Sequence, residues 1–201
     1  MDQVELQDAL DASLSWRKRE LQQARFLAEE ATGVNQAYLY RAWIMVMYAH
    51  CDQYVKDASR LYLTHLRKFP KNSYDYWSIW QAFRAKELML HANNGQKYDS
   101  ALRPRENNKS VLIEAITSVL DGGNFEYKRL RFIADFVLQV RFNHLKYKPF
   151  CKTLKEKRNE IAHGERSYVR SVEDCADWHK RTLSLLEELT DAVLGAAYTR
   201  P

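Results

Sequence analysis

The stretch between Gly33 and Pro70 contains neither glycine nor proline. It predicts one long helix from about Asn35 to Phe69, which Pro70 ends because proline lacks the backbone N–H that a helix uses. The middle of this helix, AWIMVMYAHCDQYVKDA, is apolar on nearly all sides before the pattern becomes amphipathic. We therefore expect it to be the buried central helix of the fold.

The rest of the chain also favours helices, since only 6 glycines and 4 prolines occur in 201 residues. No alternating strand pattern and no internal repeat is visible. Further helices are expected at residues 2–31, about 74–90, 110–120, 127–140 and 149–163, and after Ser171 to the end, with a loop at 92–108 and a turn at 121–124. The sequence predicts an all-α bundle of six or seven helices. It forms a single domain over residues 1–201, in which the N-terminal helix (1–33) is a candidate peripheral element.

Cysteine usage and the N-terminus favour a cytoplasmic protein without a membrane segment. The three cysteines are odd in number and lack metal-type spacing, so reduced thiols are expected: Cys51, Cys151 and Cys175. The opening MDQVELQDAL is acidic and polar, unlike a signal peptide. The longest apolar run, Ala42 to Ala49, is too short to span a bilayer.

Positive charge is concentrated in one segment. Lys128 to Arg158 holds ten Lys or Arg residues and two acids, a net charge of +8 in a chain of net charge +5. Such a segment indicates either a phosphate-binding surface or an ordinary solvated helix face. The C-terminal end of the basic segment adjoins the stretch KEKRNEIAHGE, Lys155 to Glu165. The polar residues of that stretch favour the phosphate-binding surface.

The helix after Pro149 places three polar residues of this stretch away from its apolar side. At about 100° per residue, Phe150, Leu154 and Ile161 form one stripe. Measured from Ile161, Arg158 lies about 60° away, Asn159 about 160° and His163 about 200°. Asn159 and His163 therefore lie one turn apart opposite the core, and Gly164 is placed to end the helix.

The spacing of arginine and histidine is weak evidence for a catalytic site. A histidine at a helix end has an alternative role, since its positive charge stabilises the helix dipole. Comparable spacings occur three times: Arg60/His65, Arg84/His91 and Arg158/His163. Only the third has a polar residue directly after the arginine and a glycine directly after the histidine.

RNEIAHGE resembles the signature of HEPN domains, and the all-α outline agrees. A second stretch, RAWIMVMYAHCDQYVKDASRLYL (Arg41–Leu63), is similar to one bacterial branch whose helix typically reads Tyr-Ala-His-Trp-Glu. Tyr48 and His50 are retained, whereas Cys51 and Asp52 replace the Trp and Glu. The resemblance covers most of the chain from about Tyr38 onwards.

The resemblance implies a metal-independent endoribonuclease with active sites formed across a homodimer. His163 would act as the acid or base, Arg158 would hold the phosphate, and Asn159 would donate to a phosphate oxygen or orient the histidine. Products with a 2′,3′-cyclic phosphate and a 5′-hydroxyl are expected. No metal or cofactor is expected, since the histidines form no HxxxH or HxH pair and no P-loop occurs.

Several residues are candidates for supporting roles. Tyr48, His50 and Asp52 lie on the central helix, and the adjacent lysines are candidate RNA-binding residues: Lys152, Lys155 and Lys157. Asp52 needs a partner in so apolar a stretch. Two hypotheses are a salt bridge with Arg41 and a contact that positions Arg158.

Three readings stay open from the sequence. The first is a toxin-like or phage-defence ribonuclease that forms a homodimer and has a cognate antitoxin or regulatory protein. The second is a non-catalytic HEPN module for dimerisation or partner binding, and the third is a helical RNA-binding protein.

Overall fold

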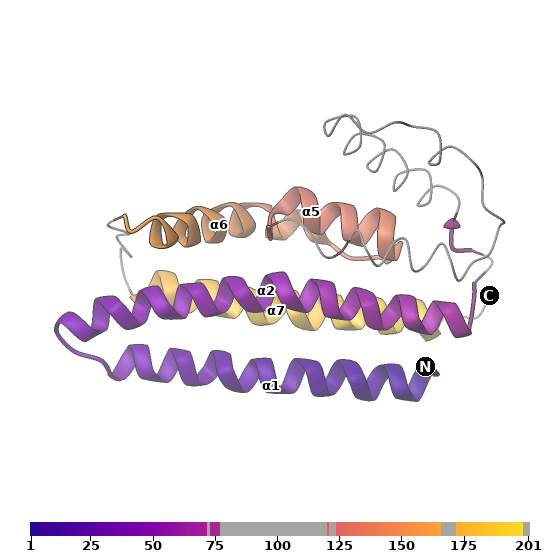
Figure 1. Ribbon diagram of the computed structural model, residues 1–201, viewed down its shortest axis with the longest axis horizontal. Coiled ribbons are helices and arrows are strands. Elements are labelled where there is room, and N and C mark those ends of the chain that lie inside the picture. Colours follow the sequence, from indigo (N-terminus) through magenta and orange to yellow (C-terminus); the bar gives the residue numbers. More distant parts are fainter. Residues whose placement is uncertain (72, 77–119, 121–123, 166–171, 199–201) are drawn as a thin grey trace, which may run out of the picture.

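The computed structural model in Figure 1 describes residues 1–71, 73–76, 120, 124–165 and 172–198. These residues form five α-helices and no strand: α1 (Gln3–Glu30), α2 (Val34–Lys68), α5 (Tyr127–Phe132), α6 (Lys148–Ala162) and α7 (Val172–Tyr198). The predicted all-α fold is confirmed. The helices expected at about 74–90 and 110–120, with the loop and turn that follow them, lie almost wholly outside the described residues.

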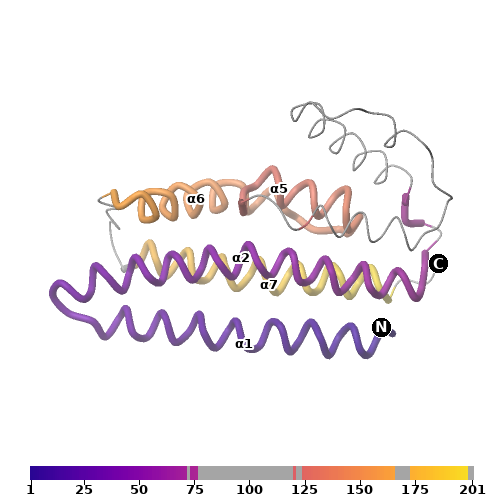
Figure 2. Tube along the Cα trace, in the orientation of Figure 1, coloured from indigo at the N-terminus to yellow at the C-terminus, as the bar shows by residue number. Residues whose placement is uncertain are grey.

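The long central helix lies where the sequence predicts it. Helix α2 packs against α1, α6 and α7. Figures 1 and 2 show α1, α2 and α7 side by side along their lengths, with α6 and α5 end to end on the other side of α2 from α1. Buried residues such as Trp43, Ile44 and Leu63 lie on different sides of α2, because α1, α6 and α7 all pack against it.

Helix α1 forms one full layer of this bundle. Its buried residues recur at helical spacing: Leu6, Leu10, Leu14, Leu21 and Ala28. Among them lies Arg17, which is 2% exposed and donates to Asp57 Oδ2 on α2 at 2.6 Å. Its guanidinium carbon also lies 4.3 Å from the Trp16 ring centroid. Because a buried charge is costly without such partners, Arg17 ties α1 to α2 in one register.

The helix expected at 127–140 changes type partway along. Helix α5 is followed directly by a π-helical segment, Ile133–Leu138, which ends at Gln139 with φ of 52°. The Gln139 side chain accepts from the Asp75 N–H at 2.8 Å and donates to the Asp75 carbonyl at 3.1 Å. These two bonds offset the cost of a left-handed conformation at a residue with a side chain.

The three cysteines are free, as predicted, and all three are buried. Burial raises the pKa values of Cys151 and Cys175 to about 12, so both stay protonated and unreactive at neutral pH. None of the described helices combines the length and the apolar character that a membrane span requires.

His179 on α7 is buried against Trp43, whose Nε1–H donates to His179 Nδ1 at 3.2 Å. Burial lowers the pKa of His179; Arg25 acts in the same direction and Glu29 against it. Burial also lowers the pKa values of two further core histidines, His50 and His65. The fold therefore favours neutral imidazoles at these positions.

We expect the protein to lose thermal stability as the pH falls from about 7 to 5. A histidine with a lowered folded pKa stabilises the fold above its unfolded pKa of about 6.5. Below that pH the unfolded chain binds more protons, so the contribution is lost. Each kcal/mol lost lowers Tm by about 2–4 °C in a chain of this size. Thermal denaturation across this range measures how Tm changes with pH, and His179→Gln should reduce that change. A Tm independent of pH would contradict the expectation.

Candidate functional site

Helix α6 presents its apolar side to the bundle and its polar side outward. Phe150, Cys151 and Leu154 are buried, whereas Ala162 and His163 are exposed. Pro149 lies in the first turn, where its missing N–H costs no helical hydrogen bond. The helix therefore begins and ends within about one residue of the predicted positions.

The end of α6 is fixed by a Schellman motif around His163. Gly164 has φ of +73°, and its N–H donates to the Ile161 carbonyl at 3.1 Å. The Glu165 N–H donates to the Glu160 carbonyl at 2.9 Å. This pair of bonds closes the helix directly after His163 and presents that residue at an exposed corner.

Substitution of Gly164 by Ala is expected to destabilise the protein by about 1–2 kcal/mol, the cost of a left-handed conformation in a residue with a Cβ. No atom lies within 4 Å of a Cβ placed there, so the cost is conformational rather than a clash. Gly195→Ala in α7 is the matched control, since its Cβ also meets nothing within 4 Å. A helical glycine replaced by alanine should gain about 0.5–1 kcal/mol. Urea denaturation compares the two variants, and an unchanged Gly164→Ala protein would contradict the assigned helix end.

Arg158 is supported by an aromatic ring instead of a carboxylate. Its guanidinium carbon lies 5.0 Å from the Tyr48 ring centroid, and Nη1 donates to Asn159 Oδ1 at 3.0 Å. The Tyr48 hydroxyl donates to the Phe125 carbonyl at 3.3 Å, and burial raises the pKa of Tyr48, so the hydroxyl keeps its proton. In the part of the chain that the structure describes, no acidic side chain forms an ion pair with Arg158. Among these residues, its positive charge is left for an anion.

Asn159 and His163 lie one turn apart beside Arg158, as the helical geometry predicts. Asn159 is half-buried and uses Oδ1 to accept from Arg158, which leaves its amide N–H groups as donors. The imidazole of His163 is exposed and has no hydrogen-bond or ion-pair partner among the described residues. The three side chains can together bind an anion and exchange a proton with it.

The hypothesis of a salt bridge between Asp52 and Arg41 is wrong. Both lie on the single helix α2, eleven residues apart, which is about 16 Å along the axis. Asp52 instead pairs with Lys56 at 2.5 Å, one turn away. Its proposed contact with Arg158 is also absent from the described ion pairs; Asp52 lies one turn from Tyr48, the residue that does contact Arg158.

His50 is not brought to this group. It is buried between α2 and α1, where Nε2 lies 2.9 Å from Glu20 Oε2 and the ring packs edge-on against Trp16. Residues two positions apart on a helix are separated by about 200° around its axis, so His50 and Tyr48 face opposite sides of α2. His50 therefore contacts α1, whereas Tyr48 contacts Arg158 on α6.

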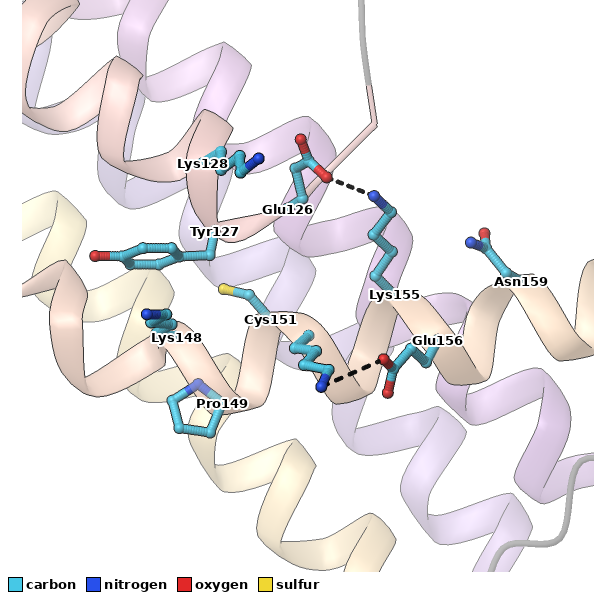
Figure 3. Close-up of a pocket in the computed structure, with 10 residues that line it drawn as sticks. Glu126, Tyr127, Lys128, Lys148, Pro149, Cys151, Lys155, Glu156 and Asn159 are labelled. Atoms are coloured by element: carbon cyan, nitrogen blue, oxygen red, sulfur yellow. Dashed lines mark hydrogen bonds and ion pairs between the residues drawn. The ribbon is translucent and has the colours of Figure 1, made fainter.

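Two of the three candidate RNA-binding lysines line a groove beside the site. Lys152 and Lys155 border a pocket of about 470 Å³, whereas Lys157 lies outside it and pairs with Glu160 at 2.8 Å. Figure 3 shows this pocket, with Asn159 at the end towards the candidate site. Lys128 and Lys148 also line it. Sequence reasoning counted both in the basic segment but did not single them out.

No cluster of three or more His, Cys, Asp or Glu side chains suited to a metal ion occurs among the described residues. The site is therefore built from a guanidinium, an amide, an imidazole and nearby ammonium groups.

A family model described as HEPN_MAE_28990:/-like HEPN matches residues 6–200, nearly the whole chain. No curated protein and no solved structure matches.

Proposed function

The chain belongs to the HEPN_MAE_28990-like HEPN family, and we propose that it is a metal-independent endoribonuclease. HEPN domains are commonly ribonucleases, and the residues of this chain suit that chemistry. The observation that carries the proposal is the group at the end of α6, where Arg158 pairs with no carboxylate among the described residues and His163 is exposed.

In the proposed reaction the 2′-hydroxyl of a ribose attacks the adjacent phosphorus and the 5′-oxygen leaves. Arg158 holds the non-bridging oxygens and stabilises the charge that develops on them. Asn159 donates its amide N–H to the same phosphate. His163 transfers a proton to or from the reacting oxygens, as an imidazole can near neutral pH.

One subunit supplies only one proton-transfer group in this scheme, whereas the reaction removes one proton and delivers another. A homodimer that brings two α6 ends together around one phosphate would supply both histidines. The proposed active unit is therefore a two-fold dimer with a composite site.

Purified protein incubated with labelled RNA in EDTA tests the proposed activity. Cleavage that yields a 2′,3′-cyclic phosphate and a 5′-hydroxyl is expected. Binding without cleavage would instead support an RNA-binding role, and the absence of both would support a non-catalytic dimerisation or partner-binding module.

Co-expression of wild-type and His163→Ala chains tests the composite site. If one phosphate requires both histidines, mixed dimers are inactive. Equal expression then leaves about one quarter of the dimers active, because that is the fraction of wild-type pairs in random assembly. Differently tagged chains allow the mixed dimer to be isolated. Half-maximal activity per dimer in that species would contradict a shared site.

We further propose that the ribonuclease acts as a toxin or phage-defence effector, because unrestrained RNA cleavage harms the cell that makes it. A cognate antitoxin or regulatory protein would then restrain it. Growth arrest on expression, relieved by Arg158→Ala, is the expected result.

A further inference from the structure

The groove between α5 and α6 has no role in the cleavage scheme above. Its volume of about 470 Å³ falls within the range of about 300–1,000 Å³ typical of ligand pockets. It is lined by residues of both helices: Glu126, Tyr127, Lys128, Lys148, Pro149, Cys151, Lys152, Lys155, Glu156 and Asn159. Because Asn159 belongs to both, the groove adjoins the candidate site; Figure 3 shows Asn159 with the other residues that line the groove.

The groove carries an excess of positive charge. Four lysines line it against two carboxylates. Lys155 pairs with Glu126, and Lys152 lies 3.9 Å from Glu156. Lys128 and Lys148 are exposed and pair with no carboxylate in the described segments. A concave surface with an excess of ammonium groups over carboxylates attracts phosphates.

The groove and the candidate site lie on one line along α6. Measured around the helix axis from Lys148, the positions Lys152, Lys155 and Asn159 lie within about 40°, and His163 lies about 60° away. Lys148 and Asn159 are about 16 Å apart along the axis. A ligand that follows this row from the site would meet a series of positive charges.

Tyr127 gives the groove an aromatic wall. Its hydroxyl lies 3.2 Å from His144 Nδ1, and His144 Nε2 lies 3.1 Å from Asp135, so the ring is held in place. Lys148 Nζ lies 5.6 Å from the Tyr127 ring centroid. Aromatic rings beside a track of positive charge are the common way in which proteins bind single-stranded nucleic acid.

We propose that this groove binds the single-stranded RNA on one side of the scissile phosphate. Lys128 and Lys148 contact backbone phosphates, and Tyr127 stacks on one base. The placement of the scissile phosphate at His163 rests on the proposed ribonuclease function. A duplex binds more weakly, because its paired and stacked bases cannot reach the tyrosine.

The full-length His163→Ala protein allows binding to be measured without cleavage. Fluorescence anisotropy follows a labelled single strand of about 12 nucleotides, within the usual size of such sites. Adding Lys128→Gln and Lys148→Gln should weaken binding about tenfold. The slope of log affinity against log salt should become shallower by about 0.7 for each lost phosphate contact. Tyr127→Leu should weaken binding about fivefold with an unchanged slope.

Arg19→Gln is the matched control, since it removes one exposed positive charge from α1, in the layer farthest from α5 and α6 (Figure 1). It should leave affinity unchanged. Equal losses in Arg19→Gln and the groove variants, unchanged binding in the groove variants, no binding by the parent, or equal binding of duplex RNA would each overturn the groove assignment. Groove-dependent binding by a wild-type protein that never cleaves RNA would uphold it and refute the ribonuclease proposal. Cleavage that depends on His163 but is unchanged in the groove variants would refute the groove assignment and support the ribonuclease proposal.

Discussion

Replacing His163 with alanine is expected to reduce RNA cleavage by about 10²–10⁴-fold, the usual contribution of a general acid or base. The fold should be unaffected, because His163 is exposed and its ring has no partner in the described residues. The backbone N–H of position 163 donates to the Asn159 carbonyl at 2.9 Å, and alanine keeps that bond. Initial rates on labelled RNA and the Tm of the same preparations provide the two measurements.

Two further variants separate proton transfer from other effects at the helix end. His163→Gln retains a polar side chain that cannot exchange protons in this pH range, so it should be as inactive as alanine. Glu165→Ala changes another exposed residue two positions away and keeps the backbone bonds that end α6. It should cleave at nearly the wild-type rate. Full activity in His163→Gln would show that the imidazole does not transfer the proton.

The helix ends were predictable because they depend on local chemistry. Pro70 and Gly164 end α2 and α6 through restrictions that act within one turn, and the exposure of His163 follows from helical periodicity once the core stripe is known. The π-helical segment after α5 was missed because a 3.6-residue period does not describe it.

The contacts between helices were less predictable. Tyr48 meets Arg158 across a sequence distance of 110 residues, and the periodicity of one helix does not say which neighbour each face receives. The same limit explains why His50 was grouped with Tyr48, although it faces α1. The choice of Lys157 instead of Lys148 has another cause: the prediction followed distance along the chain from Arg158, whereas the helical period itself places Lys148, and not Lys157, on the row of Lys152 and Asn159.

Arg158→Ala is expected to reduce the cleavage rate by about 10²–10³-fold, comparable to removing a donor from an oxyanion site. Arg158→Lys keeps the charge but loses both the planar fork and the stacking on Tyr48, so it should restore little activity. Both variants should fold, because Arg158 is only half-buried and forms no ion pair with the described acids. Wild-type rates in Arg158→Ala would remove this guanidinium from the mechanism.

The ring of Tyr48 should matter more to the rate than its hydroxyl does. Tyr48→Phe keeps the surface beneath Arg158 and loses only the bond to the Phe125 carbonyl, at a cost of about 0.5–1.5 kcal/mol in stability. Tyr48→Leu removes a cation–π contact worth about 0.5–2 kcal/mol, so kcat should fall roughly tenfold while RNA affinity changes less. Rates measured well below each variant's Tm exclude losses from unfolding. If Phe and Leu at this position gave equal kcat values, the aromatic support of Arg158 would have no part in cleavage.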